Sequence, residues 1–147
     1  MADAQRRAHA VWEGSLGQGT GTVTLESSGL GGVLPATWAS RTARSNGKTS
    51  PEELIAAAHA TCYSMALSHT LGEAGTPPAK LETDAVCTFA PVEGGFKISA
   101  VELSVKGEVP GVDAEAFAAA AAAAKDGCPV SQALMGNVAI SVTAELV

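Results

Sequence analysis

The chain has 147 residues, 46% of them hydrophobic, which suits one compact domain over residues 1–147 with a buried core. Its net charge of −6 disfavours nucleic acid as a partner, because a phosphate backbone attracts basic proteins. No uncharged run reaches the roughly 20 strongly apolar residues of a membrane span, and no apolar segment follows Arg6 and Arg7 as in a secretory signal. We therefore expect a cytoplasmic protein with no membrane partner.

The first 35 residues alternate in the manner of β-strands. "HAVWEGS" and "TGTVTLES" flank the Gly-containing connection "LGQG", which predicts a β-hairpin, and "GLGGVLPATW" predicts a third short strand or an irregular edge. The next segment, residues 39–50, is polar and contains Arg41 and Arg44, so we expect a loop. Site residues concentrate in loops held between rigid elements.

A long helix is predicted from Pro51 to the region of residues 72–75. Ser50 is a suitable N-cap, proline favours the first helical position, and Glu53 lies three residues after the cap. The sequence "GEAGTPP" then ends the helix. Small apolar residues extend beyond a single stripe, so this helix is expected to be central and buried.

The second half of the chain predicts a hairpin, two helical segments and a last strand. "LETDAVCTFAPVEGGFKISAVELSVKGEV" reads as two strands joined at "PVEGG". A helix capped by Asp113 has an all-Ala middle and breaks at Gly127, a short helical turn opens at Pro129, and "VAISVTAELV" alternates as a half-buried strand. The order β-β-(β)-α-β-β-α-β, with helices on one side, predicts an α+β fold rather than a parallel α/β fold.

Three cysteines without C-x-x-C spacing are expected to be free thiols in a reducing cytoplasm. Cys87 shares a strand face with apolar residues, which indicates a core position. Cys128 precedes Pro129 and is the predicted N-cap of a short helix, where backbone N–H groups would stabilise a thiolate. Cys62 lies in the middle of the long helix, and its position alone indicates a structural residue.

His59 lies three residues before Cys62, so the two side chains can share a helix face. Together with Cys128 they could form a three-ligand zinc site, or they could act as a Cys–His nucleophile pair. H-x-x-C arises easily by chance in an Ala-rich helix, and no orienting third residue or oxyanion motif is identifiable. A further alternative is a redox-responsive binding protein whose disulfide changes a surface without turnover.

Two longer motifs carry a family resemblance. "SPEELIAAAHATCYSMAL" and "GCPVSQAL" resemble the two cysteine motifs of the OsmC/Ohr family, the osmotically inducible and organic hydroperoxide resistance proteins, and "AHAVWEGSLGQGTGTV" and "TWASRT" are similar to its OsmC branch. The resemblance covers essentially the whole chain. It implies an OsmC-like fold, an intertwined homodimer and a cofactor-free thiol peroxidase that reduces organic hydroperoxides and protects against oxidative stress. It implies no role for Cys87.

The resemblance also implies residue roles. Cys62 corresponds to the peroxidatic cysteine and Cys128 to the resolving cysteine. The acidic residue after the proline corresponds to Glu52, and the upstream arginine to Arg41, with Arg44 as a second candidate because the alignment accepts a one-residue gap. The reductant implied is a small dithiol or a lipoyl-bearing protein.

These residue types suit that chemistry. A thiolate attacks the O–O bond, the cysteine becomes a sulfenic acid, and a second thiol converts it to a disulfide. A guanidinium favours the thiolate, and a carboxylate can hold the arginine in place. Glu52 and Cys62 are ten residues apart, roughly 15 Å along a straight helix and on different faces. If both belong to one site, Glu52 must come from a second subunit, which predicts a homodimer with two composite sites.

The apolar residues near Cys62 in the sequence indicate the substrate class. An apolar wall suits an alkyl or aryl peroxide better than H₂O₂. The residues expected to form this wall are Leu54, Ile55, Tyr63 and Met65.

Overall fold

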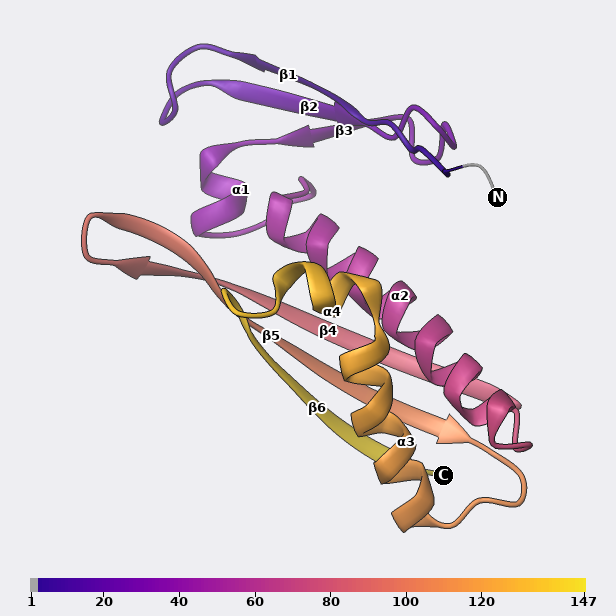
Figure 1. The fold of residues 1–147 in the computed structure, drawn as a ribbon. Helices are drawn as coiled ribbons and strands as arrows, with labels where there is room; N and C mark the ends of the chain where they lie inside the picture. Colours follow the sequence, from indigo (N-terminus) through magenta and orange to yellow (C-terminus); the bar gives the residue numbers. More distant parts are fainter. Residues whose placement is uncertain (1–2) are drawn as a thin grey trace. The chain divides into compact units, whose positions relative to one another are not determined.

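The computed structural model describes residues 3–147 and confirms the α+β fold (Figure 1). The chain forms two compact units, and the boundary between them falls inside a helix, at Leu54 and Ile55. The prediction of a single domain stays a prediction. The strands are β1 (His9–Glu13), β2 (Thr20–Thr24), β3 (Val33–Ala36), β4 (Lys80–Val92), β5 (Gly95–Glu108) and β6 (Ala139–Leu146). The helices are α1 (Trp38–Thr42), α2 (Pro51–Glu73), α3 (Ala114–Gly127) and α4 (Pro129–Leu134).

Unit 1 contains a three-stranded antiparallel sheet in the order β1-β2-β3. The predicted hairpin is confirmed, with Trp12 on β1 opposite Gly21 on β2. A Cβ atom added to Gly21 would lie 2.6 Å from Cε3 of the Trp12 ring. Glycine is therefore needed at this position for the tryptophan ring to cross the neighbouring strand.

The prediction of a loop over residues 39–50 is wrong for its first part, which belongs to α1. The cause is a capping box. The Thr37 side chain accepts a hydrogen bond from the Ser40 N–H at 3.0 Å, and the Ser40 hydroxyl accepts one from the Thr37 N–H at 2.9 Å. The Ser40 hydroxyl also lies 2.9 Å from the carbonyl oxygen of Thr49, which ties α1 to the segment before α2.

The start of α2 is as predicted. Pro51 is its first residue, and the Glu53 N–H donates to the Ser50 hydroxyl oxygen at 3.1 Å. The expectation that the whole helix is buried is wrong. One side of it, here called the open flank, is exposed because the helix buries only the sides that it turns to the sheet and to α3. The open flank consists of Ala57, Ala58, Thr61, Met65, Ser68 and His69.

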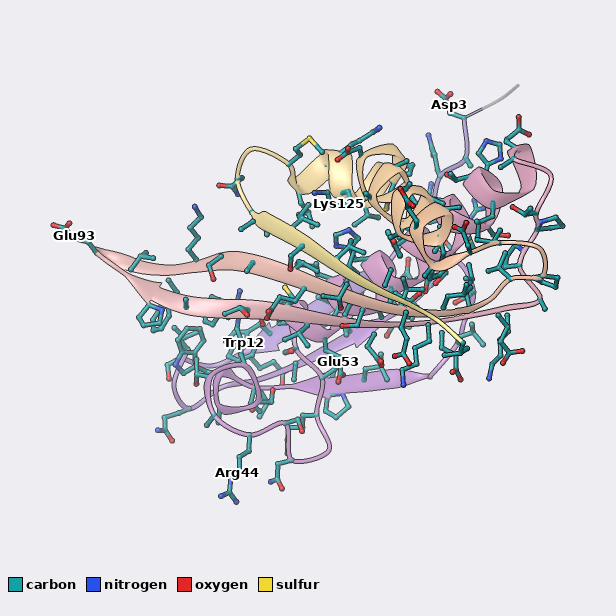
Figure 2. All side chains as sticks on the ribbon, turned by 90° about the horizontal axis from the view of Figure 1, so that it is seen from below. Asp3, Trp12, Arg44, Glu53, Glu93 and Lys125 are labelled. Atoms are coloured by element: carbon teal, nitrogen blue, oxygen red, sulfur yellow. The ribbon has the colours of Figure 1, made fainter. Side chains whose placement is uncertain are left out.

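Unit 2 contains a sheet in the order β4-β5-β6. The predicted long hairpin is confirmed as the antiparallel pair β4 and β5, whereas β6 pairs with β5 in parallel. The sequence did not predict the parallel pair, which arises because α3 and α4 form the crossover between the two strands. Val101, Leu103 and Val105 of β5 are buried and the residues between them are exposed. Figure 2 shows α3 and α4 on one face of this sheet, as predicted.

The core of unit 2 lies between that face and the helices. Asp113 caps α3 as predicted, and its Oδ1 accepts a hydrogen bond from the Ala116 N–H at 2.8 Å. Phe117 of α3 is 1% exposed and contacts β5 at Gly107. None of the helices described within residues 3–147 is long and apolar enough to cross a membrane.

Gly107 provides a test of this packing. A Cβ atom there would lie 2.5 Å from Cζ of Phe117, so Gly107→Ala is expected to lower the free energy of unfolding by about 1–3 kcal/mol, measured by chemical denaturation. Gly95→Ala, on the same strand, meets no atom within 4 Å and is the matched control. Equal stability of the two variants would contradict this contact.

Candidate active site

Arg41 and Glu52 form a salt bridge within unit 1. The Arg41 Nε atom lies 3.0 Å and 3.2 Å from the two carboxylate oxygens, and its Nη2 atom lies 2.9 Å from Oε1. The Glu52 side chain is only 8% exposed and that of Arg41 is 29% exposed. The structure therefore selects Arg41 over Arg44 as the arginine paired with Glu52. Arg44 is exposed and extends outward in Figure 2.

Arg41 and Glu52 are brought together by the end of one helix and the start of the next. Arg41 lies in the last turn of α1, and Glu52 lies in the first turn of α2. The guanidinium carbon of Arg41 also lies 5.9 Å from the centroid of the Trp38 ring, within cation–π range. A carboxylate on one side and an aromatic ring on another leave the guanidinium little freedom. It is a preorganised hydrogen-bond donor for an anion or a developing negative charge.

A mainly apolar cavity of about 440 Å³ in unit 1 has Arg41 in its wall. Trp12, Trp38 and Leu54 also line it. Leu54, expected beside Cys62, thus lies in the wall that contains the arginine. A guanidinium at the edge of an apolar cavity suits a ligand that has a hydrocarbon body and a polar end.

Cys62 and Cys128 form the second cluster, within unit 2. Cys62 is partly buried on α2, whereas Cys128 is 0% exposed at the junction of α3 and α4. The predicted N-cap position of Cys128 is confirmed, although its side chain makes no capping hydrogen bond. The two thiols are in hydrogen-bonding contact, which raises the pKa of Cys62 and lowers the pKa of Cys128.

The two thiols differ in ionisation. Burial raises the pKa of Cys62, against a smaller opposing effect of the Val130 N–H. Burial also acts to raise the pKa of Cys128, but the backbone N–H and the hydroxyl of Ser131, Cys62 and the Val130 N–H together outweigh it and lower the pKa. The negative charge of the pair is therefore favoured at the buried sulfur.

Access to the two sulfurs also differs. Cys62 lines a cavity of about 370 Å³ together with Met65 and other residues of α2, Gly127 and Pro129. Tyr63, expected in the same wall, is 0% exposed in the core, and its hydroxyl donates to the Ala121 carbonyl oxygen at 2.9 Å. Ile55 is half-buried on α2 and is not part of this wall.

His59 does not join the two thiols. Its Nε2 atom lies 2.7 Å from the Ser131 hydroxyl oxygen, both residues are fully buried, and burial lowers the pKa of the imidazole. Within residues 3–147, no three His, Cys, Asp or Glu side chains gather as a metal ion requires. The zinc interpretation therefore has no geometric support. Cys87 is half-buried and packs against the core of unit 2, as its strand position predicted.

Ser131 is the site residue that the sequence reasoning missed. It lies three residues after Cys128, the position whose side chain faces the N-cap in the first turn of a helix. That spacing was a usable signal, but its partner His59 is 72 residues away in the sequence. Only the fold brings them together.

Comparison with known proteins gives consistent matches. The family of OsmC-like proteins matches residues 44–143. Peroxiredoxin OsmC of Escherichia coli is 43% identical over 135 residues, which cover 92% of this chain and 93% of that protein. Organic hydroperoxide resistance protein OhrA of Bacillus subtilis is 35% identical over 98 residues, 64% of this chain and 65% of that protein. The crystal structure of OhrB of Bacillus subtilis matches with a TM-score of 0.75 at 28% identity, over 95% of this chain and 98% of that one. The resemblance seen in the sequence is thus confirmed, and the chain belongs to the OsmC-like protein family.

Proposed function

We propose that this protein is a cysteine peroxidase that reduces organic hydroperoxides to alcohols, with Cys62 as the peroxidatic residue and Cys128 as the resolving residue. The observation that carries the proposal is the pair of contacting thiols, in which one sulfur opens onto a cavity and the other is buried. Relatives named peroxiredoxin and organic hydroperoxide resistance protein support the reaction class.

The accessible thiol takes the first step. The Cys62 thiolate attacks one oxygen of the O–O bond, the S–O bond forms, and the alkoxide leaves and takes up a proton. The Cys128 thiolate then attacks the sulfur of the sulfenic acid, which forms the disulfide and releases hydroxide, protonated to water. An external dithiol or lipoyl-bearing protein in the cytoplasm returns both cysteines to thiols.

Arg41 and Glu52 have a role in the first step. Burial raises the pKa of Cys62, so this thiol needs a cation to be active near neutral pH. The Arg41 guanidinium meets that need and can also stabilise charge on the departing oxygen. Glu52 holds Arg41 at 2.9 Å and keeps it oriented.

In this proposal, the arginine comes from a partner subunit. Glu52 and Cys62 are ten residues apart on α2, which argues against their meeting within one helix. The open flank of α2 supports dimerisation, because small exposed residues such as Ala57, Ala58 and Thr61 allow a second helix to approach closely. A two-fold axis there gives two equivalent composite sites.

Mass spectrometry after one equivalent of cumene hydroperoxide tests the cysteine roles. We expect one intramolecular disulfide between Cys62 and Cys128, seen as the loss of two hydrogens and mapped by peptide digestion. Cys87→Ser is the control and should form the same disulfide. A disulfide that includes Cys87, or the absence of any disulfide, would contradict the assignment.

A further inference from the structure

A buried polar pair links the same two helices as the thiol pair. The His59 Nε2 atom of α2 lies 2.7 Å from the Ser131 hydroxyl oxygen of α4, and both side chains are 0% exposed. His59 lies three residues before Cys62, and Ser131 lies three residues after Cys128. The mechanism described above does not use either residue. Burying two polar side chains beside the cysteines lowers the stability of the fold unless their hydrogen-bonding groups are satisfied.

The hydrogen-bond partners indicate which imidazole nitrogen carries the proton. The Nδ1 atom of His59 is buried and has no partner. A buried N–H group without an acceptor is rarer than a buried acceptor without a donor, so the proton belongs on Nε2. Burial lowers the pKa of His59, which keeps the ring neutral with this single proton. Nε2–H therefore donates to the hydroxyl oxygen of Ser131.

This assignment leaves the hydroxyl proton of Ser131 available. A serine hydroxyl has one proton, and the proton is not engaged by His59 when the imidazole is the donor. Cys128 and Ser131 occupy the N-cap and third positions of α4, whose side chains face each other across a first helical turn. The nearby sulfur of Cys128 is buried, with no water to solvate its charge.

We propose that His59 and Ser131 are positioning residues that direct the Ser131 hydroxyl proton to the sulfur of Cys128 and hold it as a thiolate ready to attack oxidised Cys62. The inference rests on the proposed function and adds two residues to its second step. The lowered pKa of Cys128, to which the Ser131 hydroxyl contributes, agrees with it.

The hydrogen bond acts directly on the resolving step. The Cys128 thiolate forms the S–S bond while the S–O bond of the Cys62 sulfenic acid breaks, and the leaving hydroxide takes up a proton to become water. Ser131 keeps its own proton throughout and only stabilises the charge before the attack. Loss of its hydroxyl therefore slows disulfide formation. It does not slow the oxidation of Cys62 by peroxide, because less negative charge at Cys128 opposes the ionisation of Cys62 less.

The test follows the two steps separately. Full-length protein receives one equivalent of cumene hydroperoxide, is quenched at intervals with dimedone, and is analysed by intact mass. In Ser131→Ala we expect disulfide formation to slow roughly 10–100-fold, as for the loss of a hydrogen bond to a charged group, with dimedone-labelled Cys62 accumulating. Ser131→Thr keeps the hydroxyl and should recover much of the rate. Ser64→Ala, which removes a partly buried hydroxyl from α2, is the control.

The outcomes separate the inference from the proposed function. Disulfide formation at the wild-type rate in Ser131→Ala would overturn the inference alone, whereas wild type that forms neither adduct nor disulfide would overturn both. A measurement on wild type does not depend on the folding of any variant. Nitrogen-15 NMR of the histidine rings should show His59 protonated at Nε2, and protonation at Nδ1 instead would overturn the inference.

Discussion

Replacing Cys62 by serine should abolish the reduction of cumene hydroperoxide, with kcat/KM falling on the order of 10³-fold or more, because the proposed mechanism begins at this thiol. Among the cysteines within residues 3–147, Cys62 is the one that lines the cavity of about 370 Å³. Replacing Cys128 by serine should have a different effect. The first turnover remains, since Cys62 still reacts, but the sulfenic acid then persists until the external dithiol attacks it directly, so steady-state turnover is slowed.

A coupled assay with excess dithiothreitol measures both results. Cys87→Ser is the matched control and should keep wild-type turnover, because Cys87 packs against the core of unit 2. Metal analysis of the same preparations separates a peroxidase from a zinc-binding protein. Full turnover in Cys62→Ser would disprove the proposed function, and normal turnover in Cys128→Ser would disprove only the resolving role.

Replacing Arg41 by alanine should lower kcat/KM for the same peroxide by roughly 10²–10³-fold, the usual cost of losing one donor to developing negative charge. The buried carboxylate of Glu52 also loses its partner, so some loss of stability is expected and should be measured by thermal unfolding. Arg44→Ala is the control, because Arg44 is exposed and should be dispensable.

Mixing two inactive variants then tests where the arginine comes from. A dimer of one Cys62→Ser chain and one Arg41→Ala chain has one intact site if the arginine acts across the interface. Random exchange of equal amounts should restore about a quarter of wild-type activity, since half of the dimers are mixed and each has one of two sites. If arginine and cysteine act within one chain, the mixture should stay inactive. A fully active monomer at high dilution would also contradict the composite site.

The parts of the fold that could be predicted depend on local signals. The start of α2 was predictable because Ser50 and Pro51 are cap and first-turn residues whose hydrogen bonds are formed nearby. The hairpin of β4 and β5 was predictable because the turn sequence "PVEGG" joins two strand-forming segments. Helix α1 is stabilised by an equally local capping box, between Thr37 and Ser40, but its five residues give no periodic pattern.

The parts that could not be predicted depend on contacts between distant residues. The parallel pairing of β6 with β5 is set by the crossover and not by either strand's pattern. The choice between Arg41 and Arg44 depended on which of them reaches Glu52. The contact of His59 with Ser131 could not be predicted, because the two residues are 72 positions apart and neither belongs to a local pattern that points to the other.

The axial position of α3, the helix that precedes Cys128, is poorly defined by most of its own side chains. Its seven consecutive alanines, residues 118–124, offer identical side chains at every turn, so packing of that stretch alone cannot distinguish one axial position from the next. A slip of one residue would move Cys128 by about 1.5 Å and rotate it by about 100°. Phe117 seated over Gly107, and the Ala121 carbonyl held by Tyr63, remove this ambiguity. Tyr63, buried in the core, thus helps to fix the position of Cys128 relative to Cys62.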